Sequence, residues 1–247
     1  MKIIISPAKK MNVDTDTYEY TDLPVFLSRT KKLMNYMKSL SFDEAKTLWG
    51  CNDKIAAQNF ERCAQMDLER RLTPAIISYE GIQYQYMSPM VFSEEGLAYV
   101  QNNLRILSGF YGILKPFDGV TPYRLEMQAK ASVCGFKDLY DYWGDSLYQE
   151  LTSDGDKIIL NLASKEYSKC IEKYVTPDIH FITCVFGEKT NGKVVQKGTF
   201  AKMARGEMVR FLAENAVDTL EGVKEFNGLG YSFSAEDSTE NQYAFLK

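Results

Sequence analysis

Histidine is almost absent from the sequence, which has one, His180, in 247 residues. Most zinc hydrolases, ferritin-like iron sites and serine-type catalytic triads need histidines at defined places. The scarcity argues against those classes, and we predict no metal site and no bound cofactor. His180 lies in an alternating apolar run, I-H-F-I-T-C-V-F. We therefore interpret it as a paired or surface residue of a strand rather than a ligand.

Long apolar runs and paired cysteines are also missing. The run Ile3–Ile5 near the amino terminus is too short for the core of a signal peptide, and no stretch of about 18 apolar residues could span a membrane. We therefore expect a cytoplasmic protein with no membrane partner. The five cysteines lie far apart, without a C-x-x-C pair. This spacing predicts buried free thiols in a reducing compartment, with a thiol redox sensor as a weaker alternative.

The order of apolar runs predicts an α/β (mixed α+β) fold, in which a central mixed sheet is flanked by helices. We expect one compact domain over residues 1–247, and a division near residue 150 is the alternative. Predicted strands cover Lys2–Ser6, Pro74–Tyr79, Ile158–Leu162 and His180–Phe186, with Gly192–Gln196 closing a hairpin at Asn191-Gly192 and Gly230–Phe233 and Tyr243–Leu246 near the end.

Helix signals fall between these strands. The capping box Ser41-x-x-Glu44 predicts a helix that Gly50 ends, and Asn52 caps a second helix to about Met66. Ser93 begins a helix with Leu97, Val100 and Leu104 on one face, and a further helix runs from about Phe200 to Glu214.

Charge is segregated along the chain. The formal net charge is −4, which argues against a protein coated in nucleic acid. Residues 187–210 nevertheless hold six cations against two acids, whereas residues 211–247 hold seven acids against two lysines. This pattern fits a focused anion site, and a solvated basic face is the alternative.

Three segments combine small residues with polar side chains. Ser6, Lys9 and Lys10 follow the first predicted strand, at the end where open α/β sheets bind ligands. In the second segment, residues 107–127, Lys115 precedes a proline, and Tyr123 stands beside Arg124 and Glu126. Because extended residues two apart share a face, Arg124 and Glu126 could form a structural ion pair or aim an arginine at phosphate.

The third segment, N-L-A-S-K-E-Y at residues 161–167, marks a strand-to-helix junction. Asn161 or Ser164 could cap that helix, or its free N–H groups could hold an anion. Further on, Lys202 and Arg205 share a helix face, and Arg210 lies approximately on the same side. Like charges at this spacing repel unless an anion lies between them, which hints at function.

Six of these motifs together resemble the YaaA peroxide-stress protein family of bacteria, over nearly the whole chain. The motifs are I-S-P-A-K at residues 5–9, R-I-L-S-G-F-Y-G-I-L-K-P at 105–116, P-Y-R-L-E-M at 122–127, N-L-A-S-K-E-Y at 161–167, A-K-M-A-R-G at 201–206 and G-Y-S-F at 230–233. The resemblance implies a cytoplasmic protein that limits intracellular free iron during peroxide stress and binds DNA through a basic cleft. It also implies a helix-hairpin-helix-like element, which would fall at Leu104–Leu114 with Gly109 and Gly112 in the hairpin, although R-I-L-S could equally form a strand.

Two functions from different classes follow. The first is a non-enzymatic protein that binds DNA without sequence preference, with phosphate contacts from basic side chains and with Tyr111 and Tyr123 stacking on bases. The second is an enzyme for a nucleobase, a nucleotide or a related phosphorylated small molecule, with Glu126 or Glu166 as general acid/base. The candidate DNA or anion ligands are Ser6, Lys9, Lys10, Lys115, Tyr123, Arg124, Asn161, Ser164, Lys202, Arg205 and Arg210. An enclosed pocket joining Glu126, Asn161 and Lys202 would favour the enzyme, and an open basic cleft would favour DNA.

Overall fold

A computed structural model describes all residues, 1–247. Its central sheet has the order β11-β12-β9-β8-β1-β5-β6, with β10 paired to β9. The five inner strands are parallel: β5 (Leu104–Ser108), β1 (Lys2–Ile5), β8 (Ile158–Asn161), β9 (His180–Thr190) and β12 (Gln242–Leu246). Antiparallel partners flank them: β6 (Gly112–Leu114), β10 (Lys193–Val195) and β11 (Ser232–Thr239). The predicted mixed sheet is therefore confirmed.

The first strand lies inside this sheet because three of its four residues are isoleucines and all four are buried. Ile3, Ile4 and Ile5 have no exposed surface, and β1 pairs with β5 on one side and β8 on the other. One continuous cluster of buried apolar side chains includes residues from both sides of residue 150. The hydrophobic core therefore ties the first and last parts of the chain together.

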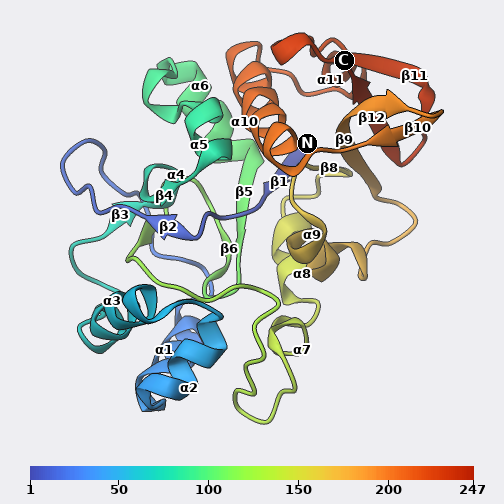
Figure 1. Cartoon of the computed structure of the whole chain (residues 1–247). Coiled ribbons are helices and arrows are strands. Elements are labelled where there is room, and N and C mark those ends of the chain that lie inside the picture. The colour runs from blue at the N-terminus through green and yellow to red at the C-terminus, as the bar shows by residue number, and fades with distance from the viewer.

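Helices surround the sheet in three groups (Figure 1). One group contains α1 (Leu27–Ser39), α2 (Phe42–Trp49) and α3 (Asp53–Ala64). A second contains α5 (Ile82–Met87), α6 (Glu94–Asn103) and the long α10 (Gly198–Glu214). The third contains α7 (Leu139–Trp143), α8 (Ser146–Thr152) and α9 (Lys165–Glu172). The shorter pieces are α4 (Ala75–Ser78), η1 (Pro89–Val91), α11 (Leu220–Lys224), η2 (Gly228–Gly230) and two small sheets that pair β2 (Lys10–Met11) with β4 (Tyr79–Glu80) and β3 (Thr73–Pro74) with β7 (Gly119–Val120).

The predicted helix caps are confirmed. Ser41 and Glu44 form a reciprocal capping box at α2, and Gly50 ends that helix in the left-handed region. Asn52 caps α3 and Ser93 caps α6 through their side-chain oxygens. The hairpin at Asn191-Gly192 and the helix ending at Glu214 are present as well. Leu104, predicted on the face of α6, is instead the first residue of β5, because it pairs with Ile3 of the central strand.

The prediction of a strand over Pro74–Tyr79 is wrong. The segment forms one helical turn, α4, between two short strands. Its first N–H groups donate to a distant loop: Ala75 to the carbonyl of Asp118 and Ile76 to that of Pro116, both at 2.9 Å. These long-range hydrogen bonds replace the ladder that a strand would need, so tertiary contacts override the β-propensity of the isoleucines.

The helix-hairpin-helix-like element at Leu104–Leu114 is also contradicted. Residues Leu104–Ser108 and Gly112–Leu114 are buried strands of the central sheet, joined by a tight turn. Ser108 fixes that turn, since its hydroxyl accepts hydrogen bonds from the N–H groups of Phe110 and Tyr111. The segment offers no exposed helix for a DNA backbone, because pairing with β1 places it inside the sheet.

Candidate functional site

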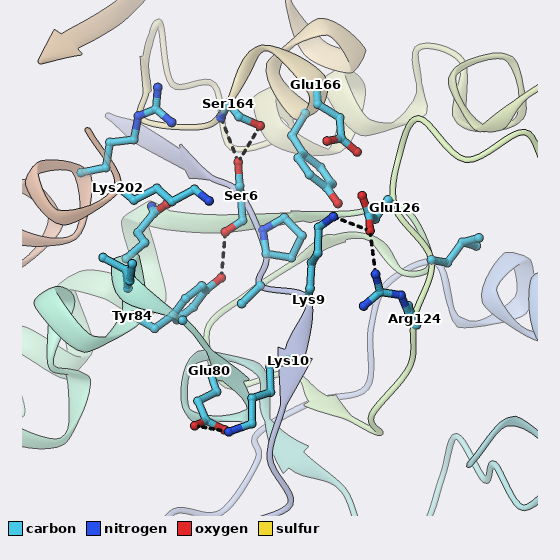
Figure 2. Close-up of a pocket in the computed structure, with 18 of the residues that line it drawn as sticks. Ser6, Lys9, Lys10, Glu80, Tyr84, Arg124, Glu126, Ser164, Glu166 and Lys202 are labelled. Atoms are coloured by element: carbon cyan, nitrogen blue, oxygen red, sulfur yellow. Dashed lines mark hydrogen bonds and ion pairs between the residues drawn. The ribbon is translucent and has the colours of Figure 1, made fainter. Parts of the chain in front are cut away.

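A pocket of about 440 Å³ lies beyond the carboxyl ends of β1 and β8 (Figure 2). This is the edge at which open parallel sheets bind ligands. Its walls come from the loop after β1, the start of α5, an extended segment at 123–126, the start of α9 and one face of α10. The lining residues are Ser6, Pro7, Ala8, Lys9, Lys10, Glu80, Gly81, Ile82, Gln83, Tyr84, Tyr123, Arg124, Leu125, Glu126, Ser164, Glu166, Tyr167, Lys202 and Arg205.

Ser6 joins the two strand ends. Its hydroxyl accepts a hydrogen bond from the N–H of Ser164 at 2.8 Å and donates to the Ser164 hydroxyl at 3.2 Å. Its carbonyl accepts from the Tyr84 hydroxyl at 3.0 Å. Ser164 stands at the cap position of α9, yet its side chain makes no capping bond. The loop after β1 thus supplies the polar group that meets the beginning of α9.

A carboxylate with two cations forms the opposite wall. Glu126 accepts from Lys9 at 2.9 Å and from Arg124 at 3.4 Å, so the predicted Arg124–Glu126 pair is confirmed. The Arg124 and Glu126 side chains are 11% and 19% exposed, whereas that of Lys9 is 67% exposed. Lys10 pairs with Glu80 at 2.6 Å at the rim. Three of the five cations that line the pocket therefore already have carboxylate partners.

The other two cations, Lys202 and Arg205 on α10, form no ion pair. The Nε of Arg205 and the Nε2 of Gln83 are buried, and neither has an acceptor within the protein. Burial lowers the pKa of the Arg205 guanidinium, but an arginine stays charged at neutral pH. One side of the pocket therefore carries uncompensated positive charge and unused donors, which is the chemistry that an anion complements.

The carboxyl of Glu166, at the start of α9, is the second acid in the pocket. Burial is the main cause that raises its pKa, and the charge of Glu126 adds to the effect. The N–H of Gln128 donates to it at 3.3 Å. Glu166 thus has a raised pKa, and it lies near Glu126, which pairs with two cations. Two carboxyl groups in such different environments are typical of acid/base pairs.

Buried phenols close the floor of the pocket. Tyr123 hydrogen-bonds the hydroxyls of Tyr79 at 2.7 Å and Ser108 at 2.6 Å. Burial raises the pKa of Tyr123 to about 12, so its phenol stays protonated at neutral pH. Tyr111, by contrast, is fully buried, and its hydroxyl accepts from the N–H of Thr121. The ring of Tyr111 is therefore not available to stack on a base.

Two glycines allow the walls to approach one another. A Cβ on Gly206 of α10 would lie 2.1 Å from the carbonyl oxygen of Gln83 in α5. A Cβ on Gly109 would lie 2.6 Å from the carbonyl oxygen of Leu125, in the segment that carries Glu126. Gly112, with φ of +79°, turns the chain from β5 into β6 against Trp143. Gly109 and Gly112 therefore do serve a hairpin, but it is a β-hairpin.

The structure does not bring three of the predicted ligands into the pocket. Asn161 is buried, where its side chain donates to Thr183 and accepts from the N–H of Ala163. Arg210 pairs with Glu214 of the same helix. Lys115 lines a separate cavity of about 250 Å³, together with Arg105 and Asp118. The pocket thus joins Glu126 and Lys202 without Asn161.

The sequence reasoning missed Glu80, Gln83, Tyr84 and Tyr167. The first three follow the segment wrongly predicted as a strand: Glu80 ends β4, and Gln83 and Tyr84 lie in the first turn of α5, after Gly81. Gly81, two residues before Gln83, was the available signal for a loop that approaches another backbone. In the structure a Cβ on Gly81 would lie 3.2 Å from the Cβ of Ala8, beside the β1 loop.

All five cysteines are free, and Cys63, Cys170 and Cys184 are buried as predicted, whereas Cys51 is half-buried and Cys134 exposed. Burial raises the pKa of each buried thiol. No cluster of three or more His, Cys, Asp or Glu side chains is placed to hold a metal ion, and His180 is exposed on β9. None of the helices has the length and apolar character that crossing a membrane requires.

The second cavity gives a prediction about pH. Burial raises the pKa of Asp118 from 3.8 to about 7, against the lowering effects of the Lys115 N–H and the charges of Lys115 and Arg105, and the Asp22 charge raises it slightly. The folded state therefore holds a proton that the unfolded chain loses near pH 4. Unfolding free energy should fall between about pH 4 and 7, by of the order of 4 kcal/mol at most from this group.

Asp118→Asn should remove that fall, because the amide cannot ionise. Urea unfolding of both proteins between pH 4 and 8 measures it, with the exposed Asp16→Asn as control. Parallel pH profiles for Asp118→Asn and the unmodified protein would contradict the prediction.

Comparison with known proteins places this architecture in a family. A family model described as "Peroxide stress protein YaaA" matches residues 1–237. A "UPF0246 protein" of Agathobacter rectalis is 57% identical over 245 residues, covering 99% of this chain and 98% of the relative. Another of Lachnoclostridium phytofermentans is 56% identical over 247 residues, covering 100% and 96%. A third, of Limosilactobacillus reuteri, is 57% identical over 246 residues, covering 99% and 98%.

Proposed function

The chain belongs to the family of YaaA peroxide stress proteins, and we propose that its pocket binds a phosphorylated small molecule of the nucleotide class. The observation that carries the proposal is the pair Lys202 and Arg205, which face the pocket without a carboxylate partner. Guanidinium and ammonium groups are the usual ligands of phosphate, and a volume of about 440 Å³ suits one nucleotide. The ligand would give the buried donors of Arg205 and Gln83 the acceptors that they lack.

The activity that we propose for this pocket is acid/base chemistry on the bound molecule. Glu166, whose pKa burial raises, would be the general acid, and Glu126, paired with Lys9 and Arg124, would be the second carboxyl group of the acid/base pair. Tyr123 and Tyr167 would orient the ligand from the floor. The cytoplasm, where nucleotides are abundant, is the compartment that this proposal requires.

Ligand-induced stabilisation tests the proposal. A ligand at about 100 times its Kd stabilises a folded protein by about 2.7 kcal/mol, which corresponds to several degrees in Tm for a chain of this size. Deoxyadenosine 5′-monophosphate and inorganic phosphate should each raise the Tm, and Lys202→Ala should abolish most of the rise. Lys193→Ala, which removes an exposed lysine of β10 outside the pocket, is the matched control. Equal shifts in both variants would count against the site.

A second candidate function is DNA binding coupled to iron limitation, which the exposed rim favours. Lys9 and Lys10 are 67% and 73% exposed, and Lys202, which lines the same pocket, is exposed as well. A backbone phosphate could contact this rim while a base enters the pocket. We propose that any effect on free iron is indirect, since a single histidine cannot supply the imidazole ligands of a histidine-built ferrous site.

Salt dependence tests the DNA proposal. If about five phosphates are neutralised, affinity should fall by between two and three decades from 50 to 200 mM salt. Titration with duplex and single-stranded DNA would measure the slope, and Lys202→Ala should reduce it by about one contact. An affinity that does not change with salt would exclude the phosphate contacts. Peroxide survival and free iron in cells that carry Lys202→Ala would then link the site to the stress response.

A further inference from the structure

A groove of about 870 Å³ adjoins the pocket, and the two share Lys9 and Glu126. The groove runs along α2 and the residues that follow Glu126. In Figure 2, Lys9, Glu126 and Arg124 lie on the side of the pocket away from Lys202. The Arg124 Nε also donates to the carbonyl of Trp49 at 3.4 Å, so one ion cluster anchors the boundary between pocket and groove. A ligand whose phosphate lies at Lys202 can therefore extend only past this cluster to reach the groove.

One member of the cluster at this boundary, Lys9, is free to change its partner. Arg124 and Glu126 are mostly buried and hold each other, whereas the Lys9 side chain is 67% exposed and reaches Glu126 from solvent. An exposed lysine pair of this kind contributes little to stability. Lys9 can therefore leave Glu126 for an anionic group of the ligand without disturbing the wall behind it.

The groove has a different chemistry from the pocket. Asp43, Glu44 and Glu126 outnumber Lys9 and Lys130, so a second phosphate is disfavoured there. Tyr36, Leu40, Leu48 and Trp49 supply apolar and aromatic surface, with Thr47 and Gln128 among them. The Trp49 side chain is buried, and its indole N–H has no acceptor within the protein. Apolar surface, carboxylate acceptors and an unused donor together suit a ring with amino and carbonyl groups.

From these observations we infer that the pocket and groove form one bipartite site for a phosphorylated compound of dinucleotide size. The phosphate lies at Lys202 and Arg205, and the second ring-bearing unit lies in the groove against Tyr36 and Trp49. Lys9 moves between Glu126 and the ligand at the junction. This inference rests on the proposed phosphate-binding function and adds the length and chemistry of the ligand.

Comparing ligands of one and two nucleotides tests the bipartite site. Isothermal titration would compare deoxyadenosine 5′-monophosphate with the 5′-phosphorylated dinucleotide of deoxyadenosine. The second unit should tighten binding by about tenfold or more, the gain typical of one stacked base. Thr47→Trp places a bulky ring in the groove from an exposed position of α2 and should abolish that gain while leaving the mononucleotide affinity within about twofold.

Gln58→Trp adds the same ring at an exposed position of α3 outside the groove, and it should keep the full gain. If the mononucleotide binds but the dinucleotide is no tighter, or if Thr47→Trp keeps the gain, the bipartite site is overturned while the phosphate pocket stands. If neither compound binds and Lys202→Ala has no effect on any titration, the proposed function itself fails and the bipartite site fails with it.

Discussion

Gly206→Ala is expected to destabilise the protein by about 2 kcal/mol or more and to weaken phosphate binding. Gly206 lies where α10 crosses α5, and its Cβ would lie 2.1 Å from the Gln83 carbonyl oxygen and 2.9 Å from the Met87 nitrogen. Both are backbone atoms, so a rotamer change cannot relieve the clash. Overpacking costs about 1–3 kcal/mol and occasionally more, and this overlap lies at the severe end. Alanine recovers about 1 kcal/mol through its helix propensity, which is too little to compensate.

The binding effect follows from the same contact. Separating the two helices moves Lys202 and Arg205 away from Gln83 and Tyr84, which face them across the pocket. Urea unfolding and phosphate titration of one preparation would measure both losses. Gly198→Ala is the matched control, because Gly198 begins the same helix and its Cβ would meet no atom within 4 Å. If Gly206→Ala unfolded at the same urea concentration as Gly198→Ala, Gly206 would not be required for the contact between α10 and α5.

Gly206 also illustrates what the sequence can and cannot reveal about the site. The helix from about Phe200 to Glu214 follows from its apolar pattern, and Lys202 with Arg205 follows from i, i+3 spacing. The sequence does not show that this helix packs against α5, because α5 lies more than a hundred residues earlier in a segment without strong periodicity. The only sign of this helix crossing in the sequence near residue 206 is the glycine itself.

The ends of the buried strands could be predicted, because the apolar pattern of these strands is local. Ile3–Ile5 and the run that begins at Ile158 are short, continuous and apolar, so they identify buried parallel strands, and the polar residues after them mark the ligand edge. The sequence could not distinguish Asn161, which turns inward to Thr183, from Ser164, which reaches the pocket. They are three positions apart, and their orientation depends on how the chain leaves the sheet.

The failed helix-hairpin-helix prediction has a third cause. Glycines at positions 109 and 112 are compatible with either kind of hairpin, and the residues before them, R-I-L-S, have no strong preference between helix and strand. Pairing with β1 decides the outcome, since Ile3, Ile4 and Ile5 match Leu104, Arg105 and Ile106 in register. That pairing joins segments about a hundred residues apart, and no local pattern contains it.

Arg205→Met is expected to change stability and binding in opposite directions. The Arg205 Nε is buried without an acceptor in the protein, and burial lowers the pKa of the guanidinium, so this side chain carries a desolvated charge. Removing a buried, unsatisfied polar group for an apolar side chain of similar shape stabilises a fold by about 1–3 kcal/mol. The Tm should rise by about 2–10 °C. Phosphate affinity should fall about 30-fold or more, because the ligand loses a charged hydrogen-bond partner.

A substitution of the exposed neighbour Lys202 separates the effect on stability from the effect on binding. Lys202 lines the same pocket, but it is exposed and loses little solvation. Lys202→Met should therefore weaken phosphate binding while changing the unfolding free energy by no more than about 0.5 kcal/mol. A less stable Arg205→Met protein that still bound phosphate would mean that the guanidinium supports the fold. A more stable protein that no longer binds would mean that the fold tolerates a buried charge at this position because the ligand neutralises it.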